Sequence, residues 1–228
     1  MNNKMNIYSI SIRDNISEDS FDFWVGKVSA EKKKKVQSFK LYDDKKRSVY
    51  GELLLRYILI NDFEIKNEKI VINVDVNGKP NLKGNKDIFF NISHSGDYVV
   101  CVVDSHPIGI DIEKMDGADM QIAKRFFAEY EYKYLQRQEN KVEMFYKLWT
   151  LKESYIKCTG KGLTVPLNSF EFEFTDEIIQ LKIPRTNEFY FKSKKVFGNY
   201  YLSLCCVEQY KSMNIKQITY KELKDCLV

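Results

Sequence analysis

Residues 107–114, Pro-Ile-Gly-Ile-Asp-Ile-Glu-Lys, constrain the fold more than any other stretch of the chain. Apolar and non-apolar residues alternate there with a period of two, which predicts a β-strand with its isoleucines on one face. Asp111 and Glu113 then share the opposite face, with Cα atoms about 6.6 Å apart. Two carboxylates at that spacing, on a face that we expect a glycine to keep open, suit one divalent cation. A solvent-facing strand with ordinary surface acids is the alternative, and this stretch alone does not decide between them.

The composition predicts a globular protein: the 228-residue chain is 44% hydrophobic and 14% aromatic. No apolar run reaches the ~18 residues of a transmembrane helix, and residues 1–6 lack the apolar core of a signal peptide. We therefore expect a cytoplasmic protein. Its net charge of +4, from 36 basic and 32 acidic residues, is small for a dedicated nucleic-acid binder. Five cysteines without a C-x-x-C pair predict reduced thiols, and two histidines are too few for a histidine-based metal site.

Hydrophobic periodicity and turn residues predict helices followed by antiparallel strands in both halves of the chain. The expected helices cover about 20–26, 29–39, 43–60, 121–127, a stretch up to 137, 139–159 and 221–226. The expected strands cover 7–12, 70–76, 88–92, 98–103, 107–114 and several segments within 170–207. This repetition indicates a duplicated architecture, joined near the 107–114 strand.

The helix predicted over 139–159 carries Lys152 within its apolar arc. Glu153 lies at the edge of that arc and Lys157 one turn further on. An i, i+4 ion pair, worth about 0.2–0.5 kcal/mol, accounts for Glu153 and Lys157. It does not account for Lys152, because a lysine in a buried arc requires an anion.

Basic residues of the first half also need partners. Lys32 and Lys35 align with the apolar edge of the 29–39 helix, although a solvated face is the ordinary interpretation of a lysine run. Arg47 ends an apolar row of the 43–60 helix. An unpaired buried charge is costly, so its partner is a phosphate or a core carboxylate, and both remain open.

Taken alone, Lys79, Ser93 and His94 each have an ordinary structural explanation. Lys79, followed by Pro80, is typical of a turn exit. Ser93 and His94 fall in an expected turn after the 88–92 strand. A hydrolase triad is disfavoured for this pair, because no G-x-S-x-G elbow is present.

Two sequence blocks together resemble the 4′-phosphopantetheinyl transferases of the surfactin-synthetase-activating (Sfp) type. The first runs from Asn91-Ile92-Ser93-His94-Ser95 through Gly109-Ile110-Asp111-Ile112-Glu113. The second runs from Trp149-Thr150-Leu151-Lys152-Glu153-Ser154-Tyr155-Ile156-Lys157 through Lys161-Gly162. Their separation also fits, and the resemblance extends along nearly the whole chain. The joint pattern is specific, whereas a lone D-x-E or K-E-S match is not.

The resemblance implies an α/β (α+β) pseudo-dimer of two similar lobes, 1–108 and 109–228, each a small, mostly antiparallel sheet packed with helices. Coenzyme A would bind in the cleft between the lobes. The enzyme would transfer the 4′-phosphopantetheine arm of coenzyme A to a serine of an apo acyl or peptidyl carrier protein, as in nonribosomal peptide or polyketide biosynthesis. It would release adenosine 3′,5′-bisphosphate and depend on Mg²⁺. We expect a monomer with internal pseudo-twofold symmetry and no nucleic-acid or membrane partner.

The resemblance also implies roles for individual residues. The Mg²⁺ ligands would be Asp111, Glu113 and Glu153, with Glu153 also a candidate base, and Lys152 and Lys157 would contact the pyrophosphate. The remaining coenzyme A contacts would be Ser93 and His94 at its phosphates, Lys32, Lys35 and Arg47 at the 3′-phosphate end, and Lys79 and Pro80 beside the adenine. Ala30 stands where relatives often have proline, and the lysine run leaves the register of Lys32 and Lys35 open by one residue.

The sequence is also compatible with two other functions. One is a non-catalytic coenzyme A or nucleotide-binding module with the same cleft. The other is a nucleic-acid-binding protein that uses residues 32–35, which the modest net charge and the matched acids disfavour. The sequence does not identify the acceptor carrier protein or its docking surface. It also leaves open whether Glu153 binds the metal, accepts the proton or does both.

Overall fold

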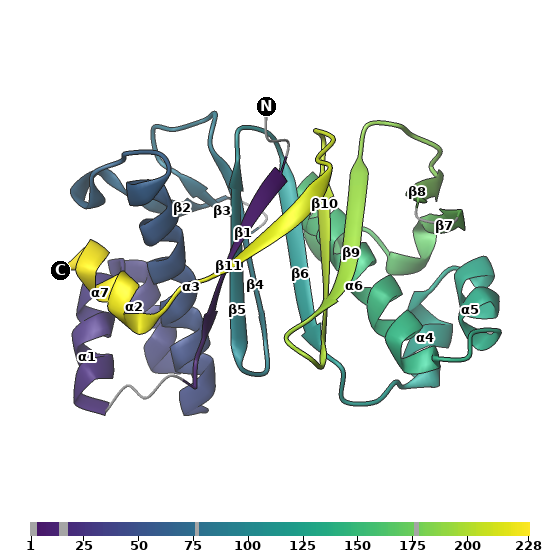
Figure 1. Ribbon diagram of the computed structural model, residues 1–228, viewed down its shortest axis with the longest axis horizontal. Helices are drawn as coiled ribbons and strands as arrows, with labels where there is room; N and C mark the ends of the chain where they lie inside the picture. Colours follow the sequence, from purple (N-terminus) through teal and green to yellow (C-terminus); the bar gives the residue numbers. More distant parts are fainter. Residues whose placement is uncertain (1–3, 14–17, 76–77, 176–177) are drawn as a thin grey trace. The chain divides into compact units, whose positions relative to one another are not determined.

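The computed structural model describes residues 4–13, 18–75, 78–175 and 178–228, and its elements are labelled in Figure 1. Contacts divide the chain into two compact units. The N-terminal unit consists of Asn6–Ser105 together with Asn214–Val228, and the C-terminal unit consists of residues 4–5 and His106–Met213.

The N-terminal unit is built on a sheet with the strand order β11-β1-β5-β4. Its strands are β1 (Lys4–Ser11), β4 (Phe89–Ser95), β5 (Tyr98–Asp104) and β11 (Ser212–Gln217), beside a small hairpin of β2 (Ile72–Val74) and β3 (Pro80–Leu82). Its helices are α1 (Glu18–Lys27), α2 (Ala30–Ser38), α3 (Tyr42–Asn61) and α7 (Tyr220–Leu227). The long helix α3 packs on β5 and β4, and the other three helices pack on α3 (Figure 1). The core of the unit therefore lies around α3.

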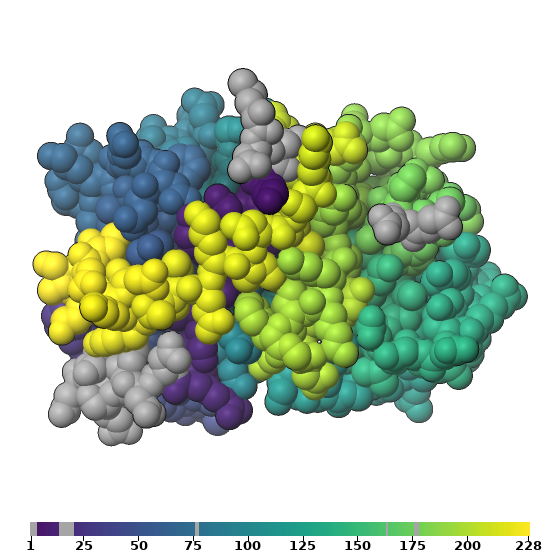
Figure 2. All heavy atoms as spheres, in the orientation of Figure 1, coloured from purple at the N-terminus to yellow at the C-terminus, as the bar shows by residue number. Residues whose placement is uncertain are grey.

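The last residues of the chain complete this N-terminal unit. Ile218, Leu223 and Leu227 are buried in the same hydrophobic cluster as α3. Figure 2 shows α7, in yellow, covering part of the surface of that unit. The predicted boundary between 108 and 109 lies close to the observed one between Ser105 and His106, but the assignment of all later residues to the second lobe is wrong for 214–228. The reason is that the apolar side chains of residues 214–228 are buried against α3, in the N-terminal unit.

The C-terminal unit has an antiparallel sheet in the order β6-β10-β9 and a separate hairpin of β7 and β8. Its strands are β6 (Ile108–Lys114), β7 (Glu171–Thr175), β8 (Ile178–Ile183), β9 (Tyr190–Val196) and β10 (Tyr200–Cys206). Its helices are α4 (Met120–Phe126), α5 (Glu129–Gln136) and α6 (Lys141–Thr159). Helix α6 packs along β6 and β10 and carries the second sequence block (Figure 1). Gly160 ends it at a φ of 69°, a left-handed backbone conformation that favours glycine at a C-cap.

The predicted class, two small antiparallel sheets packed with helices, is confirmed. Each unit places one long helix, α3 or α6, on its sheet. Three details of the strand prediction are wrong: Ser93 and His94 belong to β4 rather than to a turn, and neither β3 nor β11 was expected. Among the described residues, the helices are all too short or too polar to span a bilayer.

Candidate functional site

The face of β6 that carries Asp111 and Glu113 is turned towards α6. Asp111 is only 3% exposed, and Ser203 of β10 lies opposite it in the strand register. Glu113, two residues further along the same face, is half-buried. The interpretation of Asp111 as an ordinary surface acid is therefore wrong.

Gly109 allows α6 to approach this face of the strand closely. A Cβ atom at position 109 would stand 2.0 Å from the carbonyl oxygen of Ser154 and 2.4 Å from the backbone nitrogen of Cys158. Real Cβ contacts do not come that close. The prediction that this glycine keeps the face open is wrong, because the backbone of α6 fills the space beside it.

Asp111, Glu153 and Lys157 come together between β6 and α6, and we call them the acid–lysine cluster. The Lys157 Nζ donates to Asp111 Oδ1 at 2.6 Å and to the carbonyl oxygen of Ile110 at 3.3 Å. Burial raises the pKa of the Glu153 carboxyl, the Asp111 charge raises it further, and the Lys157 ammonium opposes both effects. Three residues that the resemblance assigns to the site are thus neighbours.

The chemistry of Asp111, Glu113 and Glu153 suits Mg²⁺, which prefers carboxylate oxygen. The mutual repulsion that raises the pKa of Glu153 is the kind that a bound cation relieves. In the observed arrangement Lys157 supplies the positive charge beside Asp111. Throughout the described part of the chain, no three His, Cys, Asp or Glu side chains are grouped closely enough to hold a metal ion. The oxygen chemistry of the three acids suits Mg²⁺, and of these acids Asp111 and Glu153 interact with each other in the structure.

Lys152 does not face this cluster, and its predicted contact with pyrophosphate is wrong. Its side chain is fully buried, and its Nζ lies 2.7 Å from Glu131 Oε2. The same nitrogen donates to the carbonyl oxygens of Leu167 and Phe170, each at 2.8 Å. These three acceptors use all the donors of an ammonium group. The anion that the buried position requires is a protein carboxylate.

Sequence reasoning missed Glu131 for a physical reason. Its carboxylate is fully buried and accepts hydrogen bonds from the backbone nitrogens of Ala128 and Phe172. The first of these contacts caps α5, but the usual signal, a serine or threonine three residues before the glutamate, is absent because position 128 is alanine. The acid therefore resembles any other surface glutamate in a charged helix.

Arg47 lies beside the turn that follows Ser93 and His94 in the N-terminal unit. Its Nη1 donates to the carbonyl oxygen of Gly96 at 2.7 Å, and its Nη2 pairs with Asp44 one turn away on α3. The observed partner is a carboxylate, but Asp44 is 36% exposed and lies on the same helix, so it is not the core carboxylate that was considered. Ser93 is buried, whereas His94 is exposed at the end of β4.

Lys32 and Lys35 are neighbours on α2. Burial lowers the pKa of the Lys32 ammonium, the nearby Glu52 carboxylate opposes that shift, and the Lys35 charge adds to it. Ser29, the N-cap of α2, accepts from the Lys32 backbone nitrogen and donates two hydrogen bonds to the Glu52 carboxylate. Lys35 is exposed, contrary to its expected place at the buried edge, because the apolar side of α2 is confined to Val36.

Lys79 and Pro80 line a separate cavity of about 280 Å³ in the N-terminal unit. Phe89 and Phe90 contribute aromatic walls, and Lys86 adds a second positive charge. This cavity is the place in the unit where the predicted adenine-side residues border a hollow.

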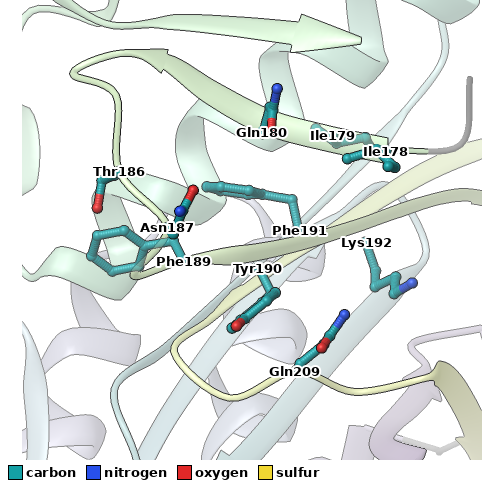
Figure 3. A pocket seen from close by; sticks show the side chains of 10 residues that line it. All are labelled: Ile178, Ile179, Gln180, Thr186, Asn187, Phe189, Tyr190, Phe191, Lys192 and Gln209. Carbon is teal, nitrogen blue, oxygen red and sulfur yellow. The ribbon is translucent and has the colours of Figure 1, made fainter. Parts of the chain in front are cut away.

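A cavity of about 380 Å³ in the C-terminal unit does not involve any predicted site residue (Figure 3). It lies along β8 and β9, where Phe191 is seen between the two strands and Tyr190 and Lys192 extend from the other side of β9. The predicted residues instead form one set in each unit. The C-terminal set is Asp111, Glu113, Glu153 and Lys157, and the N-terminal set is Lys32, Lys35, Arg47, Lys79, Pro80, Ser93 and His94.

Comparison with known proteins identifies the class first. Residues 107–205 match the model of the 4′-phosphopantetheinyl transferase superfamily, and residues 15–106 match that of the 4′-phosphopantetheinyl transferase N-terminal domain. Both models describe transferases, so the chain is a transferase enzyme.

Individual relatives agree over nearly the full length. A 4′-phosphopantetheinyl transferase of Bacillus subtilis is 37% identical over 223 residues, covering 96% of this chain and 100% of the relative. Sfp of Bacillus subtilis strain 168 is 34% identical with the same coverage. The gsp transferase of Aneurinibacillus migulanus is 44% identical over 163 residues, covering 71% of this chain and 68% of its own. The chain belongs to the 4′-phosphopantetheinyl transferase family.

Proposed function

We propose that this chain transfers the 4′-phosphopantetheine arm of coenzyme A to a serine hydroxyl of an apo acyl or peptidyl carrier protein, with Mg²⁺ as cofactor. Adenosine 3′,5′-bisphosphate is the other product. The observation that carries the proposal is the acid–lysine cluster, in which Asp111, Glu153 and Lys157 of two matched sequence blocks become neighbours.

The proposed binding of coenzyme A uses the residues of the N-terminal unit. Lys32, Lys35 and Arg47 supply positive charge for the 3′-phosphate end. Ser93 and His94 shortly precede Gly96, whose carbonyl oxygen accepts a hydrogen bond from Arg47. Arginine suits a phosphate because its planar fork can offer two parallel donors. Lys79 and Pro80 border the cavity proposed for the adenine end.

Asp111, Glu113 and Glu153 would hold the Mg²⁺. A hard cation there would neutralise charge on the pyrophosphate oxygens as the phosphorus–oxygen bond to the departing nucleotide breaks. Lys157 lies beside the same carboxylates and would stabilise the departing phosphate once a substrate phosphate competes for its ammonium group. Positioning and electrostatic stabilisation therefore account for most of the proposed catalysis.

Glu153 is the candidate acceptor for the serine proton. Its pKa is raised by burial and by Asp111, which brings the carboxylate closer to the basicity that proton transfer at neutral pH requires. The serine oxygen attacks the phosphorus, its proton goes to a carboxylate or a water held by one, and the nucleotide leaves with the bonding electrons.

The test is a mixture of the purified chain, coenzyme A, Mg²⁺ and an apo carrier protein, analysed by intact-protein mass spectrometry. We expect the carrier to gain one phosphopantetheine arm, and a panel of acyl and peptidyl carriers identifies the acceptor. An Asp111→Asn variant serves as the matched control. Coenzyme A binding without any gain of mass on the whole panel contradicts the transferase and favours a non-catalytic coenzyme A-binding module.

We further propose that the enzyme acts as a monomer in the cytoplasm. Two units of similar construction within one chain support the first point. Five free cysteines, four of them buried, support the second, because reduced thiols are typical of a reducing compartment. Sedimentation measurements on the purified chain test the oligomeric state.

A further inference from the structure

We propose that Lys152 and Glu131 are positioning residues for the transfer reaction: their buried ion pair fixes the rotation of α6 that presents Glu153 and Lys157 to Asp111. This inference rests on the proposed function of the acid–lysine cluster. It assigns no contact with substrate to Lys152 or Glu131.

The ammonium of Lys152 is held from three directions. Its acceptors are a carboxylate of α5, the carbonyl of Leu167 in a short 3₁₀ helix, and the carbonyl of Phe170, the residue that precedes β7. The Phe170 ring also lies under the ammonium, with 4.3 Å between Nζ and the ring centre. A point charge with three directed hydrogen bonds cannot slide or turn without breaking at least one of them.

Glu131 is fixed just as firmly. One carboxylate oxygen, Oε2, accepts from Ala128 N at 2.8 Å and from Lys152, and the other, Oε1, accepts from Phe172 N at 2.8 Å. The pair therefore ties α6 to the first turn of α5 and to β7. Both side chains are 0% exposed, so solvent neither competes for these bonds nor screens them.

The position of this pair along α6 determines what it can control. Lys152 immediately precedes Glu153, and consecutive helical residues are about 100° apart around the axis. Lys152 thus anchors the side of α6 that faces α5 and β7, while Glu153 and Lys157 face β6. Any rotation of the helix about its axis moves both groups of the acid–lysine cluster away from Asp111 together.

Packing alone does not explain why a charged pair stands here. Apolar residues of similar size often replace a buried ion pair without loss of stability, so stability is not a sufficient reason for the pair. Apolar contacts also have no preferred direction, whereas the ammonium and carboxylate have fixed partners. Directional control of α6 is the property that methionine or leucine would not supply.

The test compares three purified full-length proteins by kinetics and crystallography. The first is the wild type, and the second is the double variant Lys152→Met with Glu131→Gln, which removes both charges and keeps the side-chain sizes similar. The control is Leu135→Ala, which opens a cavity one turn along α5 from Glu131 but keeps the ion pair. All rates are measured at a temperature at which each protein is fully folded. If the double variant does not fold, Glu131→Gln alone takes its place.

We expect the variant without the ion pair to lose about 30-fold or more in kcat while its KM for coenzyme A changes by less than about two-fold. Leu135→Ala keeps the wild-type kcat. The distance from Lys157 Nζ to Asp111 Oδ1 is 2.6 Å in the computed structural model. We expect the crystal of the variant to show a longer distance than the crystal of the wild type.

An unchanged kcat and an unchanged distance overturn the inference, as does an equal loss of kcat in Leu135→Ala. A wild type that is inactive on every carrier overturns the proposed function instead. The crystallographic distance still tests the positioning role in that case, so the two failures are distinguishable.

Discussion

Gly109→Ala is a sharp test of how closely α6 must lie against β6. The added methyl group would stand 2.0 Å from the Ser154 carbonyl oxygen and 2.4 Å from the Cys158 nitrogen. Both neighbours are backbone atoms, so no side-chain rotation can relieve the overlap. Restoring an ordinary contact of 3.4 Å requires the helix and strand to separate by about 1.4 Å.

Such a separation has two measurable consequences. Overpacking of a well-packed interface costs about 3 kcal/mol, which lowers the unfolding midpoint by roughly 10 °C. It also draws Glu153 and Lys157 away from Asp111, and a misplacement of about 1 Å lowers a rate about 100-fold. We therefore expect kcat for carrier modification to fall about 100-fold in protein that is still folded.

The assay is the rate of carrier modification by mass spectrometry, with thermal unfolding followed by circular dichroism. Gly26→Ala is the matched control, because a Cβ atom at this helical position has no neighbour within 4 Å. It should keep full activity and gain stability of about 0.5–1 kcal/mol. If Gly109→Ala has the unfolding midpoint and kcat of the wild type, the close approach does not constrain the site and the reasoning fails.

The remaining predictions concern the two sets of site residues and the closure of the N-terminal unit. Lys157→Met removes the positive charge that lowers the pKa of Glu153, so the pKa of Glu153 rises further. We expect kcat to fall about 100-fold at neutral pH. We also expect the acidic limb of the pH–rate profile to move to higher pH, because Glu153 then loses its proton at a higher pH. An unmoved limb contradicts a role for Glu153 as base. Arg47→Met raises KM for coenzyme A about ten-fold but leaves KM for 3′-dephospho-coenzyme A unchanged, since only the former carries the phosphate that Arg47 is proposed to bind; equal effects on the two substrates refute the assignment. Chelation of divalent ions abolishes carrier modification and added Mg²⁺ restores it, whereas full activity without metal rules out the proposed cofactor. Leu223→Ala destabilises the N-terminal unit by about 3 kcal/mol, because its side chain is fully buried against α3; an unchanged midpoint in chemical denaturation refutes the tight packing of α7.

The strand over residues 108–114 and the long helix α6 are predictable because each has a strong local signal. Alternating isoleucines fix which face Asp111 shares with Glu113, and helical spacing places Glu153 and Lys157 on neighbouring turns. The family resemblance adds their association in one site. Local pattern and family pattern agree for these four residues, and the structure makes three of them neighbours.

The partners of Lys152 are not predictable in the same way. The pattern shows that a buried ammonium needs an anion, but Glu131 is 21 residues distant and belongs to a different helix. Gly109 illustrates the same difficulty: a missing side chain leaves room equally for a ligand and for a helix backbone. Strand β11 was not predicted, because half of its residues are exposed and none is fully buried. Its sequence therefore has little of the alternation of apolar and polar residues that indicates a strand. Long-range packing decides all three cases.

The return of residues 214–228 to the N-terminal unit has a consequence for synthesis on the ribosome. Domains usually fold in the order in which they emerge, N-terminal first. Here the N-terminal unit lacks strand β11 and the buried side chains of α7 until every residue of His106–Met213 has been translated. The sheet of the N-terminal unit and the core around α3 stay incomplete while residues 106–213 are translated. The C-terminal unit therefore has all its residues before the N-terminal unit does. The nascent chain therefore exposes the part of α3 that α7 later covers until α7 has been translated, and we expect chaperones to engage it there.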